Sequence, residues 1–320
     1  MNCPPAYCAC ALLAFCVVPR GGQDKPIKQV TRAIAEPPGE KDLGKRAYKH
    51  VARLVAYGPR TPGSQARANA ADYICAHIKA LGLQPIREAW NDKKEKLRFE
   101  NIRVVLPGRS DKTLLVGTHY DTKVELDHEP GEDEQAFTGA NDGGSGAGLM
   151  LAMLEDLVHL KMHKPTLEFV WFDGEESLPA KWNIDRALFG SKHFVKKHLP
   201  GKAKGGHDYG AFVLLDMVGH KKLAIDREAT STKALFPPIE AAVAKLGYGK
   251  FFFKKDTSVD DDHVPFLNAG LPSIDLIQFE DNDEWHTYKD TMDIVSWRSL
   301  AIVGRVLWQA LPAIEARFLG

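Results

Sequence analysis

Short apolar segments that suit strands alternate along this chain with longer segments that have the periodicity of helices. This alternation is typical of a largely parallel sheet, because each helix carries the chain back across a face of the sheet. The sequence therefore predicts an α/β protein with three layers, α/β/α, around a mostly parallel mixed central sheet. Strands are expected at about 83–90, 97–106, 113–118, 167–172, 212–219 and 272–278. Helices are expected at about 42–56, 64–81, 145–161, 189–198, 232–246 and 297–316.

The charge balance narrows the class of protein. The chain of 320 residues has 42 Lys and Arg against 42 Asp and Glu, so its formal net charge is zero. The zero net charge, together with 26% charged and 44% hydrophobic residues, argues against a disordered chain, a polybasic nucleic-acid binder and an acidic tail protein. We expect no nucleic-acid partner and one domain over residues 42–320. A polar lead-in at 23–41, which contains prolines, is expected to be extended.

The first 22 residues differ from the rest. Ala6–Val18 is an apolar run too short to span a bilayer comfortably, and Gly21 and Gly22 follow it. This suits a signal peptide over residues 1–22, so we expect export to the periplasm or the exterior and no transmembrane helix in the mature chain. Because no Lys or Arg precedes the run, a disordered or interfacial N-terminus stays open, as does a lipid anchor at Cys16.

Cysteine positions agree with removal of this segment. Four of the five cysteines lie within residues 1–22, which leaves only Cys75 in the mature chain. An intrachain disulfide and a thiolate-rich metal site are then both excluded. Cys75 lies in a helical pattern with one apolar face, so we expect it to be buried by packing.

Histidines and carboxylates occur where the predicted strands end. In α/β sheets of this kind, ligands bind at the carboxyl ends of the strands, so we expect these side chains to meet at one edge. Carboxylates and histidines that recur at five or six strand ends favour a divalent metal such as zinc. The residues are His119 and Asp121, Asp142, Asp173 with Glu175 and Glu176, Asp216, Asp261 with Asp262 and His263, and Trp285 with His286.

Each of these residues has a simpler explanation when it is taken alone. His119 could be a core or surface histidine, and Asp142 could cap the helix that begins near Ser145. Glu175 and Glu176 could be a solvated acidic pair. Asp216 is harder to explain in this way, because a carboxylate at the end of an apolar strand needs a partner. Taken together, the residues favour a metal site.

Six motifs in this order resemble the zinc-dependent aminopeptidase family M28, which also contains the glutaminyl-peptide cyclotransferases. The resemblance spans about residues 45–315 and implies a zinc exopeptidase-like fold. The motifs are GTHYD (117–121), GANDGGSG (139–146), WFDGEES (171–177), LLDMVG (214–219), DDDHVPF (260–266) and EWHT (284–287).

Within that family, four details resemble the cyclotransferases. Trp182 follows the glutamate pair shortly before a Gly-Ser turn, in an insert that aminopeptidases usually lack. Asp261 stands where peptidases commonly have Ser before Asp-His, and Trp285 stands where they commonly have Tyr. Lys123, four residues after His119, also fits the cyclase pattern.

The resemblance implies a zinc-dependent acyltransferase that converts the N-terminal glutamine of peptides or proteins to pyroglutamate and releases ammonia. It implies one zinc per chain, held by Asp142, Glu176 and His286, with a fourth position open. Glu175 is expected to serve as general base and acid.

Further residues around the zinc would support this reaction. Asp261 and Asp216 would stabilise the proton relay. Trp182, Trp285 and Lys123 would bind the substrate. His119 and Asp121 would either surround the single zinc by hydrogen bonding or help to hold a second metal.

Two other functions stay open. A two-zinc aminopeptidase would remove N-terminal residues, with His119 and Asp216 as ligands of the second ion. A family member that has lost catalysis could act as a binding module, but the chain retains Glu175 and all three expected zinc ligands.

Overall fold

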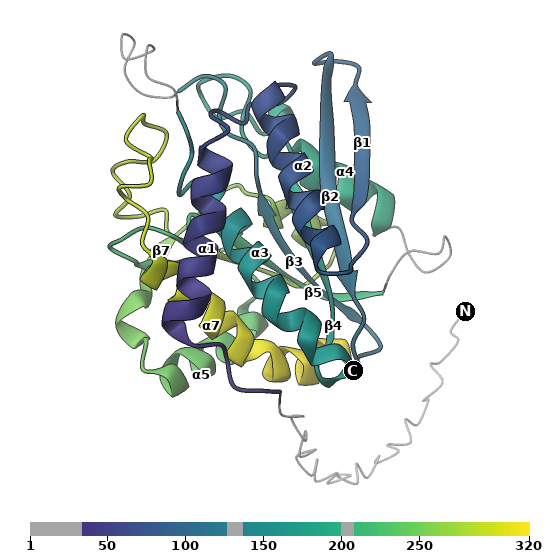
Figure 1. Cartoon of the computed structure of the whole chain (residues 1–320), viewed down its shortest axis with the longest axis vertical. Coiled ribbons are helices and arrows are strands. Elements are labelled where there is room, and N and C mark those ends of the chain that lie inside the picture. The colour runs from purple at the N-terminus through teal and green to yellow at the C-terminus, as the bar shows by residue number, and fades with distance from the viewer. Residues whose placement is uncertain (1–33, 127–136, 200–207) are drawn as a thin grey trace, which may run out of the picture. The chain divides into compact units, whose positions relative to one another are not determined.

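The computed structural model describes residues 34–126, 137–199 and 208–320, which belong to one compact unit (Figure 1). The expected signal peptide, its cysteines and the first part of the lead-in lie outside these residues. Helix α1 (Glu40–Val55) begins two residues before the domain boundary that the sequence suggests. Within the described residues, no helix is both long and apolar enough to cross a bilayer.

A six-stranded sheet forms the centre of the fold. Its strand order is β1-β2-β4-β3-β5-β8. The four strands β4, β3, β5 and β8 are mutually parallel, and β2 and β1 add an antiparallel edge. The mostly parallel mixed sheet predicted from the sequence is thereby confirmed. The strands are β1 (Ile86–Asp92), β2 (Leu97–Leu106), β3 (Thr113–His119), β4 (Thr166–Phe172), β5 (Tyr209–Asp216) and β8 (Ser273–Ile277).

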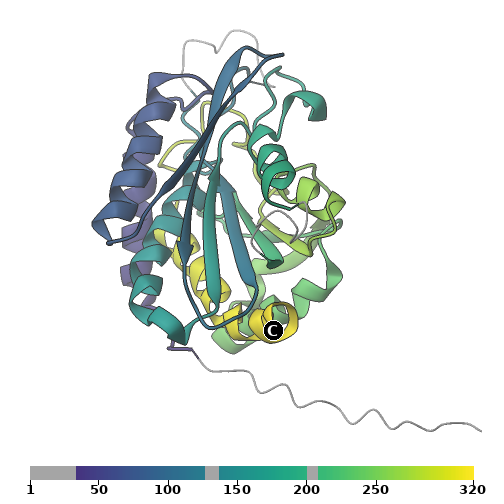
Figure 2. The same ribbon diagram turned by 90° about the vertical axis from the view of Figure 1, so that its right-hand side faces the viewer.

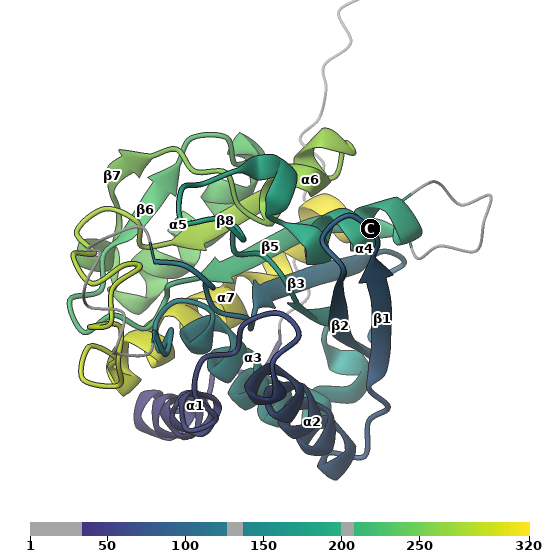
Figure 3. The same ribbon diagram turned by 90° about the horizontal axis from the view of Figure 1, so that it is seen from above.

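Helices cover both faces of this sheet (Figures 2 and 3). One face carries α1, α2 (Gln65–Ala80), α3 (Gly144–Leu157) and α7 (Trp297–Ile314), and α5 (Phe236–Leu246) packs on α7. The other face carries α4 (Phe189–His198) and α6 (His263–Asn268).

The central strands β3, β5 and β8 are buried along their whole length and are mainly apolar, because helices cover both of their faces. In β5, Val213 and Leu215 belong to the larger core under α1, α3 and α7. The alternate residues Phe212 and Leu214 belong to the smaller core under α4 and α6. Successive side chains of a strand point to opposite faces, so one short apolar segment supplies both cores and fixes three layers.

Some elements differ from the sequence-based expectation. The strands β6 (Ile225–Glu228) and β7 (Phe252–Thr257) form a small parallel sheet that was not predicted. The helix expected at 145–161 ends at Leu157, and a 3-10 segment (Val158–His163) follows it. The helix expected from 232 begins at Phe236 after a 3-10 turn (Lys233–Leu235), because two prolines occupy its start. The last helix ends at Ile314 and continues as a π turn (Glu315–Leu319).

A glycine brings the start of α3 against the carboxyl ends of two strands. A Cβ atom on Gly146 would lie 2.2 Å from Oγ1 of Thr118 in β3 and 2.4 Å from the carbonyl oxygen of Leu215 in β5. Only a residue without a side chain permits this approach. It places the loop before α3 beside the strand ends that carry the polar residues.

Candidate active site

A cavity of about 300 Å³ opens at the carboxyl ends of the parallel strands. This volume is at the lower end of the range for small-molecule sites, about 300–1,000 Å³. The described residues that line it come from the ends of β5 and β8 and from the loops after β3, β4, β5, β7 and β8. The strand-end prediction is met by the four parallel strands of the main sheet, whereas β7 belongs to the small sheet that was not predicted. They are Asp142, Glu175, Glu176, Trp182, Asp216, Met217, Ser258, Val259, Asp260, Asp261, Ile277, Phe279, Trp285 and His286.

Asp142, Glu176 and His286 converge on one point of this cavity. Nε2 of His286 lies 3.2 Å from Oε2 of Glu176 and 3.5 Å from Oδ2 of Asp142. Zinc bonds of about 2.0–2.2 Å in a tetrahedron place ligand atoms roughly 3.3–3.6 Å apart, so the spacing fits a zinc ion. Oδ2 of Asp142 and Oε1 of Glu176 are buried and have no hydrogen-bond partner among the described residues. Such orphaned carboxylate oxygens are what a bound cation would satisfy.

The backbone of His286 is in an unusual conformation. Its φ angle is +53°, in the left-handed region that side chains rarely adopt. Its ring stacks on the indole of Trp285, with centroids 3.9 Å apart. Strained residues of this kind tend to cluster at functional sites.

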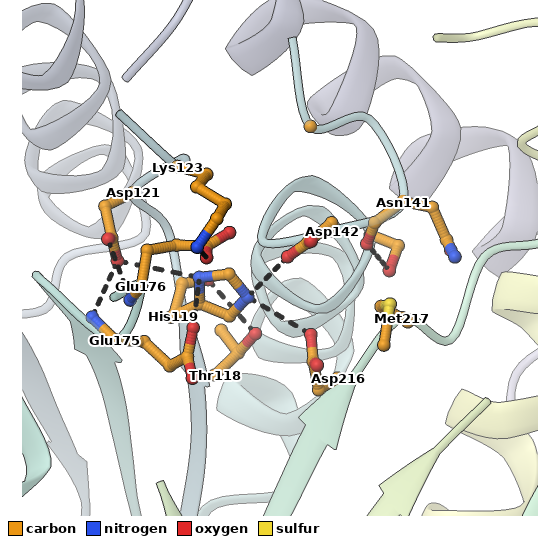
Figure 4. A network of polar contacts seen from close by, with 12 residues as sticks. Thr118, His119, Asp121, Lys123, Asn141, Asp142, Glu175, Glu176, Asp216 and Met217 are labelled. Atoms are coloured by element: carbon orange, nitrogen blue, oxygen red, sulfur yellow. Dashed lines mark hydrogen bonds and ion pairs between the residues drawn. The ribbon is translucent and has the colours of Figure 1, made fainter. Parts of the chain in front are cut away.

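A second cluster shares Asp142 with the first (Figure 4). Nε2 of His119 lies 3.1 Å from Oδ1 of Asp142 and 3.2 Å from Oδ1 of Asp216. Burial disfavours the charged imidazole, but Asp121, Asp142 and Asp216 outweigh it and raise the pKa of His119 well above its ordinary value. The two oxygens of Asp142 therefore face two different groups of possible metal ligands.

Negative charge is concentrated in this cavity, and it changes the acidity of the carboxyl groups. Burial raises the pKa of Glu175 well above its ordinary value; His119 opposes the shift, whereas Asp261 and Glu176 add to it. Burial also raises the pKa of Asp216. Burial and the charge of Asp216 raise the pKa of Asp261 to about 7. A buried group of carboxylates of this kind needs protons or a cation.

Asp121 positions the glutamate pair rather than lining the cavity. Its Oδ1 accepts a hydrogen bond from the backbone N–H of Glu175 at 3.2 Å, and its Oδ2 accepts one from that of Glu176 at 3.4 Å. Oδ1 also lies 3.5 Å from Nδ1 of His119 on the far side of the ring from Asp142 (Figure 4). The residue thus fixes the start of the loop after β4 and the orientation of His119.

The residues expected to bind substrate lie in two different places. Trp182 lines the cavity and is 39% exposed, and Trp285 lines it beside Phe279, with ring centroids 4.9 Å apart. Lys123 is buried and does not belong to the described cavity lining. Its ammonium group lies 4.0 Å from Oε2 of Glu176 and donates to the carbonyl oxygens of Ser177 and Pro179. It contacts an expected metal ligand instead of the cavity.

Asp261, Asp262 and His263 separate in the structure. Asp261 lines the cavity, whereas the other two side chains are buried outside it. His263 begins α6, and its Nε2 lies 2.8 Å from Oγ1 of Thr230. Only the first residue of the triplet can therefore touch a molecule in the cavity.

Two buried residues that the sequence did not single out hold the site together. Arg60 donates to the carbonyl oxygens of Tyr120, Thr138 and Gly139 at 2.7–2.8 Å. The carboxylate of Asp290 accepts the backbone N–H groups of Asn141 at 2.7 Å and of Asp142 at 2.9 Å. Arg60 lies in a Gly- and Pro-rich stretch that resembles an ordinary turn, and Asp290 follows the last motif without any pattern of its own.

Comparisons with known proteins agree with this geometry. The sequence model of peptidase family M28 matches residues 101–311. The chain is similar to a glutaminyl-peptide cyclotransferase of Drosophila melanogaster, with 26% identity over 292 residues that cover 81% of this chain and 79% of the relative.

Among solved structures, the chain is similar to a glutaminyl cyclase from an Acidobacteriales bacterium. The identity is 31% and the TM-score 0.77, over 89% of this chain and 98% of that one. It is also similar to a Zn-dependent exopeptidase from Parabacteroides distasonis, with 26% identity and a TM-score of 0.75 over 88% of this chain and 99% of that one. Each likeness extends over most of the chain, and the family match at residues 101–311 contains every described residue that lines the cavity.

Proposed function

Because the chain belongs to peptidase family M28 and, within it, to the glutaminyl cyclases, we propose that it is a glutaminyl-peptide cyclotransferase. It acts on peptides or proteins that begin with glutamine and turns that residue into pyroglutamate. The observation that carries this proposal is the convergence of three possible metal ligands, a buried carboxyl group and two indoles on one small cavity.

The reaction is an internal displacement. The α-amine nitrogen of the substrate bonds to the γ-carboxamide carbon, the bond from that carbon to its amide nitrogen breaks, and ammonia leaves. Nucleophile and electrophile belong to one residue, so the enzyme has mainly to select the folded-back conformer. Trp182 and Trp285 form apolar walls that suit the methylene groups of a glutamine side chain.

Asp142, Glu176 and His286 fit zinc by donor type, by spacing and by their orphaned oxygens. These residues would hold zinc where its Lewis acidity would polarise the γ-carbonyl of the substrate. The three side chains line the cavity beside Glu175, so a carboxamide held at the ion would have its α-amine towards Glu175.

Glu175 moves the proton. It takes a proton from the attacking α-amine and gives a proton to the leaving nitrogen, so no net charge is created. A carboxyl group does both only if its pKa is near the working pH, and the raised pKa of Glu175 brings it towards that range. The bonds from Asp121 to the backbone of Glu175 and Glu176 keep the carboxyl group in position.

Asp261 and Asp216 support this step from the cavity wall. Both are buried carboxyl groups with raised pKa values, and Asp216 also contacts His119. Protonated Asp261 would donate a hydrogen bond and so stabilise a neighbouring ionised group. Their role is to hold the charge of the site nearly constant while Glu175 exchanges its proton.

Mass spectrometry of two peptides tests the proposal. A peptide that begins with glutamine, and a control that begins with alanine or leucine, are incubated with the zinc-loaded protein. Loss of one ammonia from the first, with the control unchanged, is expected. If the glutamine peptide stays intact under conditions in which the protein is folded and zinc-loaded, the proposal is wrong.

A two-zinc aminopeptidase is the second candidate, and the cluster of His119, Asp142 and Asp216 favours it. In this enzyme a water oxygen would bond to the first peptide carbonyl carbon, and the C–N bond would break. Glu175 would take a proton from the water and pass it to the leaving amine. It predicts two zinc ions per chain and shortening of the alanine or leucine peptide by one residue. The same pair of peptides therefore separates the two candidates.

We also propose that the chain is exported, on the basis of the apolar run at Ala6–Val18. A full-length chain expressed in a bacterial host should lose residues 1–22 and leave the cytoplasm. An intact N-terminus in the cytoplasmic fraction would contradict this.

A further inference from the structure

A further group of side chains that could hold a metal ion lies away from the cavity. His50 of α1, His77 of α2 and Glu155 of α3 come together where the three helices pack side by side (Figures 1 and 3). Oε1 of Glu155 lies 3.0 Å from Nε2 of His50 and 3.1 Å from Nε2 of His77. Two imidazoles and one carboxylate form a ligand set that zinc uses in proteins, and these separations are within a few tenths of an ångström of tetrahedral spacing.

The orientation of the His77 ring indicates that Nε2 of His77 and Oε1 of Glu155 both face a point between them where an ion could bind. Its Nε2 is buried and, although Oε1 of Glu155 lies within 3.1 Å, it forms no hydrogen bond with any described residue. A ring nitrogen this close to a carboxylate oxygen without pointing at it is what two ligand atoms show when both face one ion.

Contacts with neighbouring side chains orient His50 and Glu155 for metal binding. Nδ1 of His50 lies 2.7 Å from Oη of Tyr73, so an Nδ1–H that donates to the hydroxyl leaves Nε2 with its lone pair for a metal. Arg46 pairs with Oε2 of Glu155, which leaves Oε1 for the ion. Partners of this kind fix the tautomer and orientation of ligands in established metal sites.

We propose that His50, His77 and Glu155 bind a zinc ion that is separate from the ion of the cavity. The side chains of His77 and Glu155 are partly exposed, which gives the ion a path of entry and a fourth position open to water. Glu155 lies 11 residues, about 17 Å, along α3 from Gly144, which follows Asp142 by two residues, so this ion does not take part in the reaction. It links three helices and holds the far end of the helix whose start carries the catalytic loop.

Zinc content tests the proposal in a chain that lacks the cavity ion. Asp142 is common to both clusters of the cavity, so Asp142→Ala removes a ligand from each. After zinc loading and desalting, the Asp142→Ala chain is expected to retain one zinc, and the Asp142→Ala/His77→Ala chain none. His159→Ala changes an exposed histidine just beyond α3 and serves as the matched control; in the Asp142→Ala chain it should leave the zinc content unchanged.

Melting temperature gives a second readout that does not depend on activity. Zinc added to the stripped Asp142→Ala chain should raise its melting temperature, because an ion that binds only the folded state stabilises it. Glu155→Gln, which keeps the shape of the side chain, should abolish most of this rise, and His159→Ala should not. An Asp142→Ala chain that retains no zinc and shows no zinc-dependent rise overturns the proposal.

Discussion

Replacement of Glu175 by glutamine tests the proton transfer most directly. Glutamine has nearly the shape of glutamate but cannot accept the proton of the α-amine. The side chain is not one of the three expected zinc ligands, and the hydrogen bond to Asp121 comes from the backbone, which the substitution leaves in place. We therefore expect the change to affect the reaction and to spare the zinc site.

The expected magnitudes differ for activity and for stability. A positioned acid–base group contributes about 10²–10⁴-fold to the rate. At 1.36 kcal/mol for each factor of ten, this is about 2.7–5.4 kcal/mol of transition-state stabilisation. Burial and the charge of Asp261 disfavour ionised Glu175, and the neutral amide relieves this penalty. The variant should therefore be at least as stable as the wild type. Its advantage should grow as the pH rises from the ordinary carboxyl pKa towards the raised pKa of Glu175, and should stay constant above it.

Three measurements on the same preparation decide the outcome. They are the kcat for a peptide that begins with glutamine, the zinc content per chain, and the urea midpoint at pH 8. Asp260→Asn is the matched control, because it removes an exposed carboxylate from the same cavity lining and should leave kcat within a few fold. Wild-type turnover in Glu175→Gln, or loss of zinc together with activity, would refute the assignment of this residue as the proton carrier.

Three further predictions concern the surroundings of the site. Asp121→Asn turns an amide NH₂ towards a backbone N–H of the glutamate pair, so zinc affinity measured by chelator competition should fall about 10–100-fold; unchanged affinity would contradict the positioning role. Gly146→Ala forces a Cβ into Thr118 and should lower the free energy of unfolding by at least about 1–3 kcal/mol in urea. Gly39→Ala, which meets no atom within 4 Å, should cost less, because it loses only the preference of a helix N-cap for glycine over alanine. Glu228 is buried, but His263 and the backbone N–H of Thr230 outweigh burial and lower its pKa from 4.5 to about 2. Above pH 5 this depressed pKa contributes about 3 kcal/mol to the free energy of unfolding, and the contribution is lost as the pH falls towards 2. The difference in urea midpoint between wild type and Glu228→Gln should therefore become smaller from pH 7 to pH 3. A difference that does not change with pH would show that Glu228 is not ionised in the folded protein.

The helices, the strands and the ends of the strands could be predicted from the sequence alone, because each depends on residues that are close together in the chain. A run such as Ala211–Leu215 in β5 is apolar at successive positions only if both faces of the strand are buried, and this implies a covered parallel sheet. A parallel sheet in turn requires the residues after its strands to meet at one edge. His119, Asp142, Glu176, Asp216 and His286 could therefore be placed together without any coordinates.

The distances within that group were decided by the tertiary structure. The sequence could not show that Asp142 turns one oxygen to His119 and the other to His286, because each contact joins loops that are far apart in the chain. Nor could it show that Lys123 turns away from the cavity. These choices depend on how each loop closes over its neighbours, and nothing in a local pattern encodes that.

The supports of the site were also invisible in the sequence. Arg60 and Asp290 form hydrogen bonds with backbone groups of loops that are distant in the chain. Backbone C=O and N–H groups are common to nearly all residues, so the sequence does not identify them as partners. His50, His77 and Glu155 look like ordinary helix residues until three helices are packed together. The sequence determined the layers, the edge that carries the chemistry and the residue types there. The tertiary structure decided which atoms face one another, because those pairings come from packing between segments whose separation along the chain carries no periodic signal.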